Sequence, residues 1–155
     1  AKYTVSIDAK NVKPNTSLKV VAVNKKTGAL ELVNNKTYKT DKDGNVSVSF
    51  KQGADYKLLT IKEATKLEKE VLKNVAPKKA KVSVKKGKTT SFAFSSKLNQ
   101  NNVKKITYKT TKKSVVSINK NGKITAGKKG TAIVKATVTL KNGKTKTVTM
   151  KITVK

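Results

Sequence analysis

The sequence predicts an all-β protein made of two small tandem β-sandwich domains and a short, partly helical connector. Thr, Val, Ser, Asn and Lys dominate the composition, which favours strands over helices. Apolar and polar residues alternate over most of the chain, as in strands with one buried face. Charge also divides the chain, because all eight carboxylates precede residue 81 and the twenty lysines that follow have none beside them. We expect a first module over residues 1–61, a connector over 62–78 and a second module over 79–155.

The first module contains a series of short strand patterns separated by turn residues. Alternation predicts strands over 3–7, 18–22, 29–33, 46–50 and 56–60, with Tyr38 on a further short strand. Turn residues at 13–15 separate the first two strands. Two further turns, at 25–28 and 41–45, are typical of β-hairpins.

The connector has a different pattern from its surroundings. Acidic residues cluster over 62–76, and Leu67, Val71 and Val75 recur at helical spacing with Leu72 beside them. Pro77 is unfavourable inside a helix. A short helix or a docked connector, ended by Pro77, is therefore predicted.

The second module reads as a small sandwich of antiparallel strands. Strands are predicted over 82–84, 92–94, 106–108, 116–118, 124–126, 132–140 and 148–154, with turns at 121–122, 127–130 and 142–143. In the last two strands the residues on the second face are lysines and threonines, with Ile133 the exception. One face is therefore expected to be buried and the other exposed to water.

A family resemblance rests on three runs of the second module. KITYKTTKKSVVSI (105–118), NGKITA (121–126) and KGTAIV (129–134) resemble the bacterial Ig-like group 2 (Big_2) family over roughly 79–155. Tyr108 stands where the family commonly has Trp, and Thr110-Thr111-Lys112 replaces its usual Ser-Ser-Asn bend. The resemblance implies an immunoglobulin-like fold and a role as a spacer or adhesion module in extracellular or cell-wall proteins, without catalytic residues. The first half resembles small β-sandwich segments of Firmicutes surface proteins.

The residue types argue against an enzyme. The chain has no His and no Cys, and its second half has no carboxylate to move a proton. A nucleophilic lysine would need a desolvated site, and no lysine lies in an apolar stretch of sequence. We expect no catalytic residues and no cofactor.

One loop resembles a calcium site. Asp41, Asp43, Gly44 and Asn45 begin like an EF-hand loop, but residues 46–52 lack the late bidentate Glu. Asp and Gly are also good turn formers, so we expect a turn and no metal ion.

Carbohydrate and nucleic acid are two further ligand classes to consider. Sugars stack on exposed aromatic rings, for which the candidates are Tyr3, Tyr38, Tyr56 and Tyr108. An accessory carbohydrate-binding module of a glycan-degrading enzyme is the alternative function. A pI near 10.3 suggests nucleic acid, but the chain lacks arginine and aromatic residues interleaved with basic ones, so specific binding is not expected.

The lysines themselves are the main candidate for function. They are dispersed, with local doublets, and a dispersed cation suits a dispersed anion such as a cell-wall polymer or a surface glycan. Solubility through mutual repulsion explains them equally well. The candidate anion-binding surface comprises Lys85, Lys86, Lys104, Lys105, Lys112, Lys113, Lys128 and Lys129.

The expected setting is the outside of a Gram-positive bacterium. The absence of cysteine fits that setting or a reducing cytosol. No apolar run is long enough for membrane insertion, and the chain begins inside a strand pattern, as a fragment of a longer protein would. We predict a monomeric, secreted surface module flanked by neighbouring domains.

Overall fold

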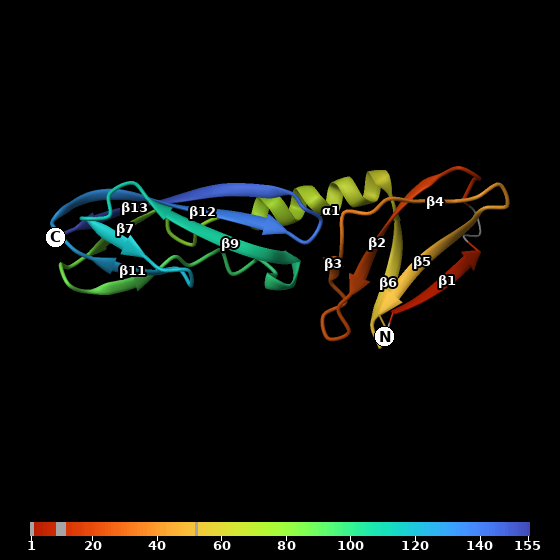
Figure 1. Ribbon diagram of the computed structural model, residues 1–155, viewed down its shortest axis with the longest axis horizontal. Coiled ribbons are helices and arrows are strands. Elements are labelled where there is room, and N and C mark those ends of the chain that lie inside the picture. Colours follow the sequence, from red (N-terminus) through yellow and green to blue (C-terminus); the bar gives the residue numbers. More distant parts are fainter. Residues whose placement is uncertain (1, 9–11, 52) are drawn as a thin grey trace. The chain divides into compact units, whose positions relative to one another are not determined.

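The computed structural model describes residues 2–8, 12–51 and 53–155, with side chains described over 12–49 and 53–155. The chain divides into two compact units. Unit 1 comprises Ala1–Glu70 with Lys141–Gly143, and unit 2 comprises Val71–Leu140 with Lys144–Lys155. The described residues are mostly β, with one α-helix (Figure 1).

Unit 1 contains two small sheets. Strand β2 (Ser17–Val23) pairs antiparallel with β3 (Leu30–Leu32), β4 (Tyr38–Lys39) and β6 (Asp55–Thr60). The other sheet is the antiparallel pair of β1 (Lys2–Asp8) and β5 (Asn45–Lys51) (Figure 1). The strands predicted for this half are confirmed.

The core of unit 1 joins these two sheets. Strands β2 and β5, from different sheets, contribute to one buried cluster of apolar side chains: Leu18, Val20, Val46 and Val48. Tyr38, Tyr56 and Leu58 pack against it and are half-buried. Unit 1 is therefore a two-layer sandwich whose layers are held by apolar burial.

The two predicted hairpins of unit 1 have different outcomes. The turn at 25–28 joins two paired strands, as predicted, because Val23 lies opposite Leu30. The hairpin prediction at 41–45 is wrong in its pairing. The turn exists, but β4 pairs with β2 and β5 pairs with β1. The chain crosses between sheets there because β4 pairs within the sheet of β2, whereas β5 pairs with β1 at the other end of unit 1's sequence, in the second sheet.

The predicted helix is confirmed as α1 (Ile61–Asn74). Its first turn is closed by a reciprocal pair of hydrogen bonds. The Thr60 amide donates to Glu63 Oε1 at 3.0 Å, and the Glu63 amide donates to Thr60 Oγ1 at 3.1 Å. This capping box satisfies two amides that the helix leaves without a partner. At the other end, Lys146 Nζ donates to the Leu72 carbonyl at 2.7 Å.

Unit 2 is a sandwich of a four-stranded and a three-stranded sheet (Figure 1). The larger sheet has the order β7 (Lys81–Val84), β13 (Thr145–Val154), β12 (Gly130–Leu140) and β9 (Val103–Thr110). The smaller sheet has the order β10 (Val116–Ile118), β11 (Lys123–Ala126) and β8 (Thr89–Ser91). Only β7 and β13 are parallel among the described pairs, and a short 3-10 helix (Gln100–Asn102) precedes β9.

Alternate residues of the long strands fill the core of unit 2. Val134, Ala136, Val138 and Leu140 of β12 are wholly buried, whereas Lys135 between them is exposed. The two sheets together contribute buried side chains from four strands: Val116, Ile124, Ala126, Ala132, Val148, Met150, Ile152 and Val154. The predicted division into a dry and a wet face is confirmed, with Ile133 39% exposed on the wet face.

One strand of unit 2 is misplaced in the sequence prediction. The strand expected over 92–94 is found at Thr89–Ser91 as β8. Phe92 is buried and its amide donates to the Gly122 carbonyl, while Phe94 forms an isolated bridge with Pro77. The bridge to Pro77 draws Phe94 out of the β8–β11 ladder, which local alternation cannot reveal.

Candidate anion-binding surface

Six of the eight candidate lysines lie at one end of unit 2, and we call them the end cluster: Lys85, Lys86, Lys112, Lys113, Lys128 and Lys129. Backbone hydrogen bonds bring their three loops together. The Gly87 amide donates to the Ala126 carbonyl at 2.9 Å, and the Lys128 amide donates to the Ser114 carbonyl at 2.9 Å. All six side chains are exposed.

The other two candidates, Lys104 and Lys105, lie elsewhere. They are exposed at the beginning of β9, and Lys105 lies opposite Thr139, close to the end of β12. The end of β9 that adjoins the end cluster is five residues further along, about 17 Å away at the rise of an extended strand. The structure therefore does not bring these two lysines to the end cluster.

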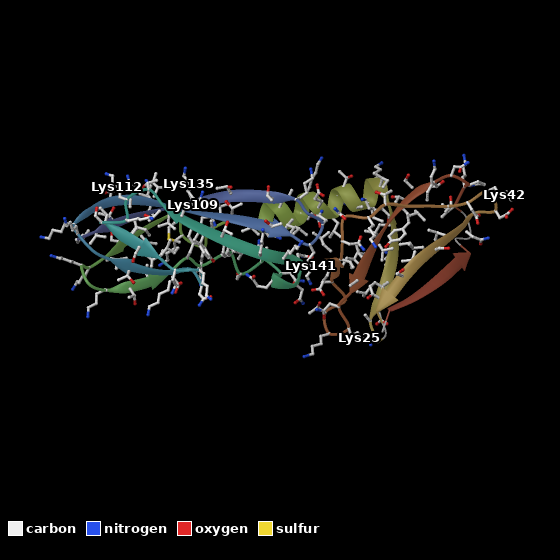
Figure 2. All side chains as sticks on the ribbon, in the orientation of Figure 1. Lys25, Lys42, Lys109, Lys112, Lys135 and Lys141 are labelled. Carbon is white, nitrogen blue, oxygen red and sulfur yellow. The ribbon has the colours of Figure 1, made fainter. Side chains whose placement is uncertain are left out.

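Strand pairing places another group of lysines together that the sequence prediction missed. Lys109 of β9 lies opposite Lys135 of β12, and Lys151 of β13 lies opposite Lys81 of β7. All four are exposed. In Figure 2, Lys109 and Lys135 extend from the same part of unit 2 as Lys112. The lysine doublets are neighbours in sequence. The pairs Lys109–Lys135 and Lys81–Lys151 are neighbours only through the register of the paired strands.

The charge around these lysines has one sign. From Val71 to Lys155 the sequence contains lysines but no Asp, Glu, Arg or His. The sum of many exposed ammonium groups produces a positive potential over the surface of unit 2. Such a potential attracts polyanions and is weakened by salt.

The aromatic side chains of unit 2 form a packed cluster. Phe92 lies 5.1 Å from Phe94 and 5.7 Å from Tyr108, measured between ring centroids. Burial raises the pKa of the Tyr108 phenol above its ordinary value. None of the described aromatic rings, here or in unit 1, is exposed as a platform on which a sugar could stack. The side chain of Tyr3, the remaining tyrosine candidate, lies outside the described residues.

The calcium-like loop is a turn in which one carboxylate binds the backbone. Asp41 Oδ1 accepts hydrogen bonds from the amides of Asp43 and Asn45, at 2.8 and 2.9 Å. Gly44 lies at φ +81° between them. That carboxylate oxygen is therefore used to hold the turn.

The described part of the chain lacks two further kinds of feature. Within it, no three His, Cys, Asp or Glu side chains come together as a metal-binding group. In the same residues there is no helix of the length and apolarity needed to cross a membrane.

Comparison with protein families identifies the second unit. Residues 71–154, more than half of the chain, match the family described as bacterial Ig-like domain (group 2). The chain belongs to this family. The resemblance to Big_2 seen in the sequence is thus confirmed, and the match begins at Val71, earlier than the expected residue 79. Val71 is buried at the end of α1, so the Big_2 segment includes the last turn of the helix.

Comparison with other proteins also finds structural neighbours. No curated protein matches the chain. A crystal structure of the C-terminal 282-residue fragment of intimin, in complex with the intimin-binding domain of the translocated intimin receptor (Tir), is similar at 14% identity with a TM-score of 0.39. The alignment covers 98% of this chain and 56% of that fragment, so the chain spans about half its length.

Proposed function

We propose that this chain is a non-catalytic extracellular module of a bacterial cell-surface protein. It acts as a spacer and adhesion domain and attaches electrostatically to anionic cell-wall polymer. The observation that carries the proposal is the charge of unit 2, which has 22 lysines and no carboxylate on a Big_2 scaffold. A surface of one sign attracts a flexible polyanion over long range without a shaped pocket.

The architecture that we propose is a tandem of two Ig-like sandwiches over 1–61 and 79–155, joined by a connector over 62–78. Two separate apolar cores support it, one around Val48 and one around Val134. A monomer of this form, between neighbouring domains of a longer protein, would hold another domain away from a Gram-positive wall.

A sedimentation experiment with purified Gram-positive cell walls tests this function. The protein is expected to bind walls at low salt, to bind more weakly at about 0.15 M salt, and to be released at about 1 M salt, where screening acts over about 3 Å. Walls stripped of teichoic acid are expected to bind much less. Binding that resists both treatments would contradict the proposal, and salt-insensitive retention by a neutral polysaccharide would favour the carbohydrate-binding alternative.

Two variants with equal reduction of charge test whether attachment to walls depends on unit 2. In the first, all six lysines of the end cluster are replaced by glutamine. In the second, six exposed lysines outside unit 2 are replaced instead: Lys26, Lys36, Lys39, Lys42, Lys57 and Lys62. The first variant is expected to bind walls more weakly than the second. Equal binding of the two variants to cell walls would show that attachment depends only on the net charge of the chain.

A further inference from the structure

Four lysines lie on the outer face of the larger sheet of unit 2, as two cross-strand pairs on neighbouring rungs. Lys81 of β7 lies opposite Lys151 of β13, and Lys135 of β12 lies opposite Lys109 of β9. The two pairs are joined through Ile133, which lies opposite Lys151 and two residues before Lys135 on the same face. We call these four residues the cross-strand lysine stripe. The Cβ atoms of the lysines lie about 5 Å apart within each pair and about 7 Å apart between the two pairs.

The surroundings of the stripe combine charge with hydroxyl groups. Next to Lys135 lies Thr149, and the adjoining rung consists of Thr107, Thr137 and Thr147. The hydroxyls of Thr137 and Thr147 lie 3.1 Å apart and hydrogen-bond to each other. Ile133, exposed between the lysines, is the one apolar side chain in this row. The face thus carries ammonium and hydroxyl groups on backbone positions that the strand register fixes.

We propose that the cross-strand lysine stripe binds a linear polyol chain linked by phosphodiesters, lying across the strands. This inference rests on the proposed function and gives it a defined site and ligand class. A phosphodiester places one negative charge on each short repeat, so successive charges can meet neighbouring lysines. The polyol hydroxyls between the charges can then hydrogen-bond with the threonines.

Two other polyanions fit the stripe less well. An acidic polysaccharide has stiff sugar rings that fix the spacing of its charges, whereas the stripe presents two different steps, of about 5 Å and about 7 Å. Single-stranded nucleic acid needs aromatic side chains on which its bases stack, and the stripe contains only lysines around one isoleucine. The flexible, acyclic repeat, which can adjust to both steps, and the threonine hydroxyls therefore favour the phosphodiester polyol.

The test uses the full chain and a synthetic linear glycerol phosphate oligomer, with binding measured by calorimetry over a series of salt concentrations. The stripe variant carries Lys81, Lys109, Lys135 and Lys151, all replaced by glutamine. The matched control removes the same charge from the smaller sheet and its loops: Lys88→Gln, Lys97→Gln, Lys120→Gln and Lys123→Gln. Circular dichroism melts of both variants verify that they fold.

The stripe variant is expected to bind the oligomer at least about tenfold more weakly than the control. Its slope of log affinity against log salt should fall by about three, because each phosphate that no longer pairs with a lysine lowers the slope by about 0.7. Amide and methyl NMR shifts induced by the oligomer should centre on Ile133, Thr137 and Thr147. Oligogalacturonate and oligo-dT of equal charge should bind the wild-type chain more weakly.

Other outcomes separate this inference from the proposed function. Equal weakening in the two variants, while the wild-type chain still binds, would overturn the stripe and leave general electrostatic attachment standing. Binding of oligo-dT or oligogalacturonate as tight as that of the glycerol phosphate oligomer would overturn the ligand class. If the wild-type chain binds neither the oligomer nor cell walls, both proposals fail.

Discussion

At the residue scale, Gly122 shows how one position is constrained both by its backbone and by a neighbour. Its φ of +82° lies in the left-handed region, and a Cβ there would come within 2.9 Å of Tyr108 Oη and 3.0 Å of Cζ. The tight turn at Asn121 and Gly122 therefore lets the Tyr108 side chain lie against the backbone. Only glycine satisfies both conditions without displacing the aromatic ring.

We predict that Gly122→Ala destabilises unit 2 by about 2 kcal/mol, through the strained φ and the displaced Tyr108. Gly87→Ala is the matched control. It has a similar φ of +80°, but nothing lies within 4 Å of the added Cβ, so it should cost only about 1 kcal/mol. Thermal and urea melts measure both. Equal destabilisation would show that the approach to Tyr108 contributes nothing.

At the scale of the element, α1 depends on the reciprocal hydrogen bonds of its first turn. Hydrogen bonding to the Thr60 amide, and then to the Thr60 hydroxyl, holds the pKa of the Glu63 carboxyl below its ordinary value. A lowered folded-state pKa means that the ionised carboxylate stabilises the folded state. This contribution is present above the unfolded-state pKa and is lost as pH falls through the folded-state value.

We predict that α1 frays at its beginning as the pH is lowered past the lowered pKa of Glu63. Glu63→Gln should remove this step while keeping a side chain that can accept the hydrogen bond. NMR chemical shifts of residues 61–74 measure it. Glu70→Gln, which removes a carboxylate outside the first turn, should leave the step in place. An acid transition that persists in Glu63→Gln would contradict the assignment.

Thr60→Ala, which deletes the cap, should lower the free energy of unfolding by about 1 kcal/mol at neutral pH.

At the scale of the whole molecule, the two units differ sharply in charge balance. Unit 1 has eight carboxylates among 15 lysines, whereas unit 2 has 22 lysines and none. Two ammonium groups about 5 Å apart in water repel by on the order of 1 kcal/mol. Unit 2 is therefore folded by apolar burial against the repulsion of its own surface, and part of that repulsion is open to screening.

We predict that unit 2 gains stability as salt rises from about 0.01 M to about 0.15 M, while the screening length falls from about 30 Å to about 8 Å. Unit 1 should gain less, because its charges have both signs. Salt-dependent melts followed by NMR can use the methyl groups of Ile124 and Ile152 in unit 2, and those of Leu18 and Val48 in unit 1. The absence of a gain in unit 2 would show that its lysines do not repel one another measurably.

Local sequence was sufficient for what depends on chain neighbours. Alternation identified most strands and the exposed face with Ile133, helical spacing identified α1, and the glycine turns at 121–122 and 142–143 were placed correctly. The Big_2 runs identified the family. These features are encoded within a few residues, because a side chain's face follows from a period of two in strands and about 3.6 in helices.

The tertiary structure alone decided which strands pair and in which register. In the folded chain, β4 and β5 lie in different sheets and Phe94 forms a bridge with Pro77. Lys104 and Lys105 lie apart from the end cluster. The fold also brings Lys81 beside Lys151, seventy residues apart in the chain. The sequence by itself thus determined that unit 2 is a lysine-coated β-sandwich, whereas the fold determined which lysines are neighbours. The physical reason is that strand pairing depends on packing against distant partners, which no local pattern specifies.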